Sequence, residues 1–267
     1  MRSLRLEGTR ITEPPEREVT RLLPEPAEKL KVAEVYHDIF FPKLEERPYV
    51  LTNMVSSLDG KAVVEGTAGS IGGVIDRMIM RNLRAHADAV MIGASTLRAE
   101  KLTLSVTQDL ARQRVSRGLE PQPLSVLTTV SGNLPLENHL LDYTSDNLLV
   151  FVSPSTPSLS IKKLSSLSSV ETVTSLNETL QILKQRYAVD VLLIEGGPSL
   201  NHALVSEHLV DELFLTLSPK LFGGERDSTL TILEGPTLEK TIYASPVSIY
   251  AARGELFLRC ALEGKFR

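Results

Sequence analysis

The chain has 267 residues, with 42% hydrophobic and 23% charged side chains and a formal net charge of −4. At roughly 100–200 residues per domain, this length corresponds to one large domain or two small ones. The charge balance has no basic surplus and so predicts no nucleic acid and no membrane as a partner. The single cysteine, Cys260, excludes a disulfide framework and a zinc site built from several thiolates. The polar start and the short apolar runs predict neither a signal peptide nor a membrane span, so we expect a cytoplasmic protein.

Residues 1–45 differ from the rest of the chain because they are rich in Glu, Arg and Pro. We interpret them as a partly ordered N-terminal arm with one short helix over Ala27–Phe40. Packing on the main domain or on a second subunit would order this arm. The main domain is then expected over residues 46–267.

The main domain alternates short apolar segments with segments of helical periodicity. In chain order, the pattern predicts strands at Tyr49–Val55 and Ala62–Val64, a helix at Val74–His86, a strand at Asp88–Gly93, a helical turn at Ala94–Glu100, a helix at Thr107–Gly118, strands at Leu124–Val130 and Leu148–Val152, a loop at Ser153–Ser169 with a short helix at Ile161–Leu164, a helix at Leu176–Tyr187, a strand at Asp190–Glu195, a helix at Ser199–His208, and strands at Leu213–Leu217, Tyr243–Arg253 and Glu255–Leu262. The last two strands would pair around Gly254. This order predicts an α/β fold with a mixed, mostly parallel sheet flanked by helices and an antiparallel C-terminal edge.

Two strand-to-helix junctions have the composition of an anion-binding site. The strand Asp190–Glu195 is followed by Gly-Gly-Pro at 196–198, and the strand Asp88–Gly93 is followed by Ala-Ser-Thr at 94–96. Glycine lets a backbone approach a phosphate, and a helix N-terminus offers N–H groups without intrahelical partners. A tight turn with only a structural role explains each junction equally well, because neither contains the full dinucleotide fingerprint or a P-loop.

Two further features carry weaker predictions. The turn Ser56–Lys61 contains Asp59, but an Asp-Gly turn usually serves only to reverse the chain. Arg84, late in the helix Val74–His86, faces solvent by default, and a guanidinium turned inward would suit a phosphate. The five histidines have no metal-ligand spacing, so no metal site is predicted.

Taken together, these segments resemble the reductase domain of riboflavin biosynthesis, the C-terminal half of the bifunctional deaminase/reductase, and the stand-alone diaminopyrimidine-phosphate reductases. The matching segments are Arg47–Lys61, Leu83–Glu100 and Ile194–Gly224, within a resemblance over about Arg47–Leu262. The resemblance implies a dihydrofolate-reductase-like fold, a homodimer and NADPH as hydride donor, with NADH not excluded. It implies as substrate a phosphorylated ribosylamino-pyrimidine, which accepts hydride at ribose C1′ and becomes the ribitylamino product. The cofactor would perform the difficult step, and the protein would orient the reactants.

The resemblance also implies roles for individual residues. Catalytic roles fall to Glu195 and Asp59, and substrate contacts to Asn53, Arg84 and Glu195, with Arg84 holding the ribose phosphate. Cofactor contacts are implied for Gly93, Thr96, Glu100, Ser70, Gly196, Gly197, Pro198, Ser199 and Leu200.

Several positions depart from the family pattern. Asn53 stands where many bacterial members have Lys, and Glu100 where Asp is common. The run Glu100–Thr107 lacks the terminal arginine that helps to bind phosphate, and the segment Leu127–Gly132 has hydroxyls in place of a basic residue near the NADPH 2′-phosphate. Two alternatives therefore remain: the same fold and cofactor with a different small-molecule substrate, and a non-catalytic nucleotide-binding module.

Overall fold

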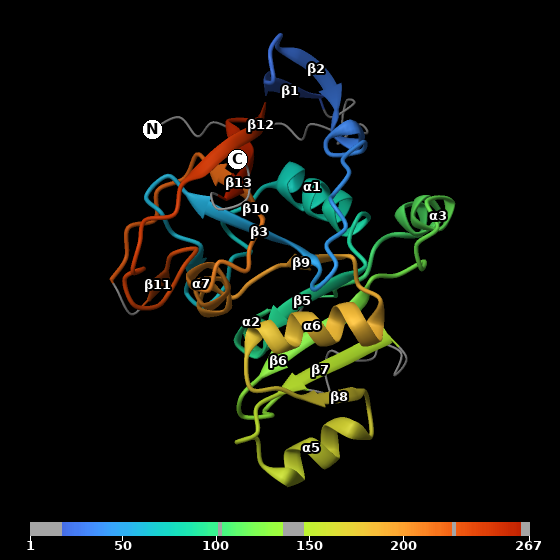
Figure 1. Cartoon of the computed structure of the whole chain (residues 1–267). Helices are drawn as coiled ribbons and strands as arrows, with labels where there is room; N and C mark the ends of the chain where they lie inside the picture. Colours follow the sequence, from blue (N-terminus) through green and yellow to red (C-terminus); the bar gives the residue numbers. More distant parts are fainter. Residues whose placement is uncertain (1–17, 101–102, 136–146, 226–227, 263–267) are drawn as a thin grey trace, which may run out of the picture.

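The computed structural model describes residues 18–100, 103–135, 147–225 and 228–262. These residues form an 11-stranded sheet as the central layer of the molecule (Figure 1). Its spatial order is β2 (Glu28–Lys31), β1 (Glu18–Leu23), β12 (Ala244–Ala252), β13 (Glu255–Leu262), β10 (Glu212–Ser218), β3 (Tyr49–Ser57), β9 (Val191–Ile194), β5 (Ala89–Gly93), β6 (Leu124–Thr129), β7 (Leu148–Val152) and β8 (Ser169–Thr172). Two short strands, β4 (Val63–Val64) and β11 (Thr229–Leu230), pair beside this sheet.

Strand direction divides the sheet into two parts. Every neighbouring pair from β10 to β8 is parallel. The pairs β10–β13, β13–β12, β12–β1 and β1–β2 are antiparallel. The predicted mixed sheet with an antiparallel C-terminal edge is therefore confirmed.

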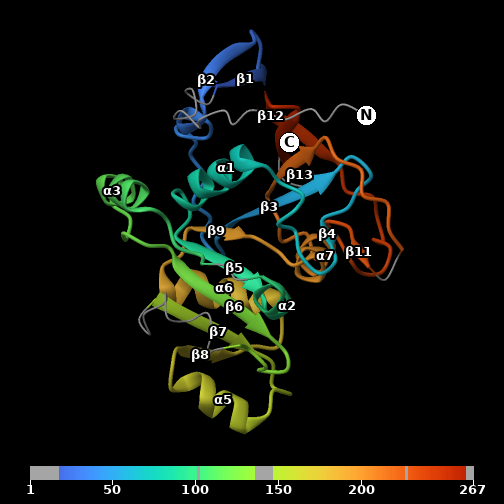
Figure 2. The ribbon, with the colours of Figure 1, turned by 180° about the vertical axis from the view of Figure 1, so that it is seen from behind.

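Helices cover both faces of the sheet, as the opposite views of Figures 1 and 2 show. On one face, α1 (Val74–Arg84), α2 (Ala94–Ala99) and α5 (Ser158–Ser165) contribute to one hydrophobic core. On the other, α6 (Leu176–Tyr187) and α7 (Pro198–Ser206) pack in a second core, while the short α3 (Gln108–Ser116) lies near the end of α1. Successive strand residues point to opposite faces, so each central strand supplies both cores: Val90 belongs to the first core and Met91 to the second.

The arm-like N-terminal segment differs from the prediction. The expected helix over Ala27–Phe40 is wrong, because this stretch forms β2 and a single 3-10 turn, η1 (Val32–Glu34). β1 pairs with β12 and extends the sheet. Tyr36 is buried and meets the rings of Phe214 and Tyr250 edge-on at 5.0 and 5.3 Å. The described part of the segment thus packs on the main domain, and residues 1–17 lie outside the described residues.

The remaining predicted helices and strands match the structure to within a few residues at their ends. The strands β1, β2, β8 and β11 were not predicted. Cys260 is buried on β13, as expected for a packed thiol. Within the described ranges, no helix is long and apolar enough to cross a membrane.

Candidate active site

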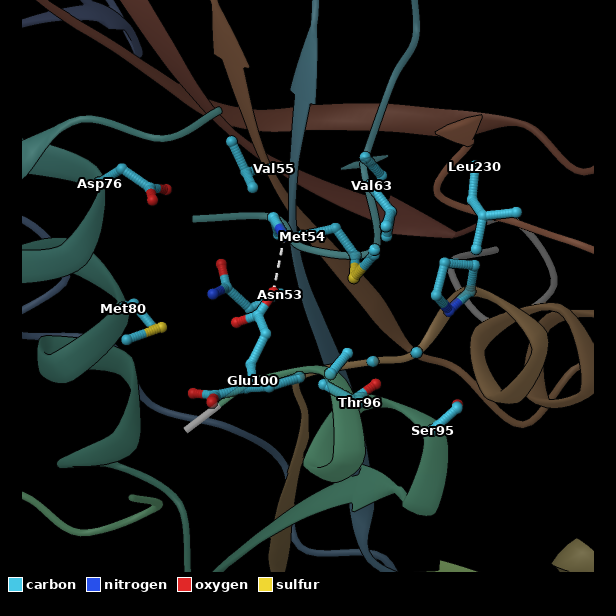
Figure 3. Close-up of a pocket in the computed structure, with 18 of the residues that line it drawn as sticks. Asn53, Met54, Val55, Val63, Asp76, Met80, Ser95, Thr96, Glu100 and Leu230 are labelled. Carbon is cyan, nitrogen blue, oxygen red and sulfur yellow. Dashed lines mark hydrogen bonds between the residues drawn. The ribbon is translucent and has the colours of Figure 1, made fainter. Parts of the chain in front are cut away.

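A cavity of about 240 Å³ lies beside the middle of β3, where the parallel strands β5 and β9 end (Figure 3). Thr52 of β3 and Met91 of β5 are both in register with Ile194 of β9. The residues that follow β5 and β9 therefore meet at one edge of the sheet, level with Asn53 in the middle of β3. Open α/β sheets bind their ligands at such carboxyl ends of strands. Asn53 and Glu195 reach the cavity from this edge, and residues of α1, α2, β4 and β11 complete its walls.

The turn after β9 forms a glycine cradle at the N-terminus of α7. Gly196 has a φ of +95°, and its carbonyl oxygen accepts a hydrogen bond of 2.9 Å from the N–H of Gly93. Gly197 has no room for a side chain, since a Cβ there would lie 2.8 Å from Thr96 Oγ1. Pro198 occupies the first turn of α7, where its missing N–H costs nothing. Backbone groups, a hydroxyl and a helix N-terminus thus line the cavity together, an arrangement that suits a bound phosphate.

Arg84 and Glu195 form a buried ion pair at the cavity wall. Arg84 Nε donates to Glu195 Oε1 at 2.7 Å, and Nη2 donates to Oε2 at 2.5 Å. The two side chains are only 4% and 5% exposed. Arg84 Nη1 also donates to the carbonyl oxygens of Thr103 and Ser105, at 2.8 and 3.2 Å. The pair fixes the orientation of Glu195, and a substrate phosphate would have to compete with Glu195 for this guanidinium, so the phosphate contact of Arg84 stays a prediction.

The end of α1 that carries Arg84 is held by a second buried arginine. Arg114 Nη1 donates to the carbonyl oxygens of Arg84 and Ala87, at 2.9 and 2.5 Å. These carbonyls lie at the helix C-terminus, where the chain offers them no intrahelical donors. Burial lowers the pKa of Arg114 to about 10, which still leaves it charged at neutral pH.

Asp76 is a residue of the cavity that the sequence did not single out. It lies in the first turn of α1, and Figure 3 shows its side chain and that of Met80 pointing from α1 toward Asn53. The pKa of Asp76 is raised to about 6, because burial and the nearby Glu255 carboxylate together outweigh a hydrogen bond from Thr216. Asp76, Met80 and Arg84 are spaced four residues apart, so one face of α1 lines the cavity. That spacing, counted back from Arg84, is the pattern from which Asp76 was predictable.

Glu100 connects the glycine-rich loop between β4 and α1, residues 65–73, to the cavity. Its Oε1 accepts hydrogen bonds from the N–H of Ala68 at 2.6 Å and from Thr67 Oγ1 at 3.3 Å. The carboxylate therefore holds the loop against the end of α2, and it also lines the cavity. Residues 101–102 of the predicted run Glu100–Thr107 lie outside the described residues.

Asp59 does not line the cavity. Its Oδ2 accepts hydrogen bonds from the N–H groups of Gly223 and Phe222, at 2.7 and 3.1 Å. Hydrogen bonds from the Ser57 hydroxyl and from Gly223 hold the pKa of Asp59 below its ordinary value. In this structure the carboxylate connects the turn after β3 to the loop after β10.

The predicted site residues thus divide into two groups. The structure brings eight of them together as lining of the cavity: Asn53, Arg84, Thr96, Glu100, Glu195, Gly196, Gly197 and Pro198. Gly93 contacts this group through its hydrogen bond to Gly196. The others do not line the cavity: Asp59, Ser70, Ser199 and Leu200. In the part of the chain that the structure describes, no group of three His, Cys, Asp or Glu is arranged to hold a metal ion.

The fold has a counterpart among solved structures. A pyrimidine reductase-like protein from Corynebacterium diphtheriae is similar with a TM-score of 0.72 and 22% sequence identity, over 82% of this chain and 93% of that chain. Likeness at this identity establishes the fold alone, which is that of this pyrimidine reductase-like protein.

Sequence comparison then identifies the family. A curated relative from Archaeoglobus fulgidus, named 2,5-diamino-6-ribosylamino-4(3H)-pyrimidinone 5′-phosphate reductase, is 34% identical over 200 residues, which cover 73% of this chain and 90% of the relative. The riboflavin biosynthesis protein RibD of Chlamydia trachomatis is 30% identical over 193 residues, covering 70% of this chain and 50% of the relative. The family model described as the RibD C-terminal domain matches residues 48–245. The chain belongs to the RibD C-terminal domain family.

Proposed function

We propose that this chain reduces a ribosylamino-pyrimidine 5′-phosphate in riboflavin biosynthesis, with NADPH as the hydride donor. The observation that carries the proposal is the meeting, at the ends of the parallel strands β5 and β9, of a glycine cradle with a carboxylate held by a buried arginine. The name of the Archaeoglobus relative supports this substrate class.

The glycine cradle suits a dinucleotide cofactor. The backbone of Gly196 and Gly197, the N-terminus of α7 and the hydroxyl of Thr96 would hold its phosphates. A side chain at position 197 would fill the space beside Thr96 that a close backbone approach needs. When bound, the reduced nicotinamide supplies the hydride, and the protein binds and orients the reactants.

Other residues of the same cavity suit the pyrimidine and the ribose. Asn53 offers an amide donor and an amide acceptor, which match the mixed donors and acceptors of a pyrimidine edge. Glu195 offers carboxylate oxygens in an orientation that Arg84 fixes. Apolar side chains of Met54, Val55 and Met80 reduce access of water to the same space.

A second candidate is the same fold and cofactor with a different small-molecule substrate. The observation that favours it is the commitment of Arg84 to Glu195, which leaves the binding of a ribose phosphate to other groups. Following the family resemblance, we also propose a homodimer located in the cytoplasm.

The test measures oxidation of NADPH, and of NADH for comparison, with the ribosylamino diaminopyrimidinone 5′-phosphate and with its deaminated uracil analogue. We expect turnover with one of them, faster with NADPH, and loss of turnover in Glu195→Gln. A thermal shift by NADPH without turnover of either pyrimidine would favour the second candidate. The proposed function is refuted if NADPH causes no thermal shift and neither pyrimidine is turned over.

A further inference from the structure

The candidate active site contains a carboxyl group that the roles described so far do not use. Asp76 lines the cavity from the first turn of α1, four residues before Met80 and on the same face (Figure 3). Its Oδ2 lies so close to Gly72 that a Cβ at position 72 would collide with it. The absence of a side chain at Gly72 is therefore a condition for the observed position of this carboxyl group.

The surroundings of Asp76 shift it toward its protonated form. Its pKa is raised to about 6, by burial first and also by the carboxylates of Glu255 on β13 and Glu195 after β9. The Thr216 hydroxyl on β10 and the guanidinium of the neighbouring Arg77 act in the opposite direction. The other two carboxylates that line the cavity form structural hydrogen bonds. Glu195 accepts two hydrogen bonds from Arg84, and Glu100 accepts one from the N–H of Ala68.

Reduction of a ribosylamine requires a proton as well as a hydride. In the closed ribose ring, C1′ is saturated and cannot accept a hydride. It becomes an acceptor when the nitrogen lone pair forms the C1′=N bond and the C1′–O4′ bond breaks, which leaves O4′ in need of a proton. Positioned general acids accelerate such a step by about 10²–10⁴-fold, most effectively when their pKa lies near the working pH.

We propose that Asp76 is the general acid that protonates O4′ and opens the ribose ring of the substrate. Asp76 gives up its proton as the C1′–O4′ bond breaks, so that O4′ becomes the 4′-hydroxyl and the substrate becomes a cationic C1′=N species. Hydride addition at C1′, which a bound reduced nicotinamide would supply, would then give the neutral ribitylamine, and solvent would return a proton to Asp76. This inference rests on the proposed function, because only a glycosylamine substrate requires ring opening.

Ring opening is measurable without any cofactor, because reclosure interconverts the α and β anomers at C1′. With the ribosylamino-pyrimidine phosphate, we expect the wild-type protein to accelerate anomeric exchange, observed by NMR exchange spectroscopy. Asp76→Asn should lose roughly 10²–10⁴-fold of this acceleration. Gly72→Ala keeps the carboxyl group but displaces it, and should lose much of the acceleration as well. Asp109→Asn is the matched control, since Asp109 is also a first-turn carboxylate but lies on the surface of α3, and it should behave as wild type.

Turnover supplies a second readout that a merely structural role would not change. The wild-type kcat should fall as the pH rises above about 6, and this limb should be absent in Asp76→Asn. The primary isotope effect with deuterated NADPH should fall toward unity in Asp76→Asn, because ring opening would then limit the rate.

The inference is overturned if Asp76→Asn exchanges anomers as fast as wild type, or if it retains both the pH limb and the wild-type isotope effect. A lowered Tm with all three readouts unchanged would assign Asp76 a structural role only. If the wild-type protein neither exchanges anomers nor oxidises NADPH with these pyrimidines, the proposed function fails and this inference fails with it. Wild-type turnover combined with unaffected Asp76→Asn overturns this inference alone.

Discussion

The ion pair between Arg84 and Glu195 allows a direct test of how the site is held. In Arg84→Met the unbranched stem remains, but the Glu195 carboxylate, 5% exposed, loses its hydrogen bonds of 2.7 and 2.5 Å. Breaking a buried pair by removing one partner costs about 3–5 kcal/mol, because an uncompensated charge stays buried. For a domain of this size, each kcal/mol lowers the Tm by roughly 2–4 °C, so we expect a decrease of roughly 6–20 °C.

Glu195→Gln should cost less than Arg84→Met. The amide keeps one acceptor for Arg84, whose Nη1 also retains the carbonyls of Thr103 and Ser105. A lost or weakened hydrogen bond to a charged group costs about 1–3 kcal/mol. The double variant removes both charges, so its cost should be well below the sum of the two single costs.

Urea unfolding followed by far-UV circular dichroism measures the free energy of unfolding of all four proteins. The expected order of destabilisation is Arg84→Met above Glu195→Gln, with a coupling energy of at least about 1 kcal/mol. Strictly additive costs, or an Arg84→Met cost below about 1 kcal/mol, would show that the pair is not desolvated and does not fix Glu195.

Three further predictions concern the cradle, Asp76 and the N-terminal segment. Gly197→Ala places a Cβ 2.8 Å from Thr96 Oγ1, so NADPH should shift the Tm less than in wild type, and an equal shift in a thermal titration would contradict the cradle. Because the pKa of Asp76 is raised from 3.8 to about 6, the folded state binds more protons than the unfolded state between these values, and stability should fall by about 3 kcal/mol as the pH rises through that window. Urea unfolding at several pH values should show a smaller decrease in Asp76→Asn; an identical decrease would assign it to other groups. A chain that begins at residue 46 lacks the buried side chains of Val19, Val32, Val35 and Tyr36. Their burial is worth about 1.5–3 kcal/mol each, together comparable with the whole stability of a domain. Gel filtration and near-UV circular dichroism should therefore show loss of the native fold, and a native spectrum would contradict this prediction.

The sequence predicts the strands of the sheet that form apolar runs, and it does not predict the polar ones. The central strands β5, β7 and β9 are covered by helices on both faces and read as continuous apolar runs. The strands β2 and β8, with sequences EKLK and SVET, lie at the two edges of the sheet and are polar. Each pairs with one neighbour only, β2 with β1 and β8 with β7. Their strand conformation depends on these backbone hydrogen bonds, which local propensity does not report.

The sequence predicts where the candidate active site lies better than it predicts what each side chain does there. The glycine turn at 196–198 and the carboxyl ends of the strands identify the edge at which a ligand binds. The hydrogen-bond partners of individual side chains are not predictable in this way, because they come from long-range packing. Arg84 is separated from Glu195 by 111 positions, and Asp59 from Gly223 by 164. For the same reason, the burial that raises the pKa of Asp76 has no sequence pattern of its own.

These contacts make α1 the element that sets the geometry of the cavity. Its first turn carries Asp76, and its last turn carries Arg84, which orients Glu195. Both ends are fixed by buried charged side chains: Glu255 Oε1 accepts a hydrogen bond of 2.7 Å from the N–H of Gly73, and Arg114 donates to the C-terminal carbonyls. A carboxylate at the N-terminus and a cation at the C-terminus both match the helix dipole. The distance from the proposed proton donor to the glycine cradle therefore depends on how α1 is anchored to the sheet, so changes at Glu255 or Arg114 should alter catalysis through the position of the helix.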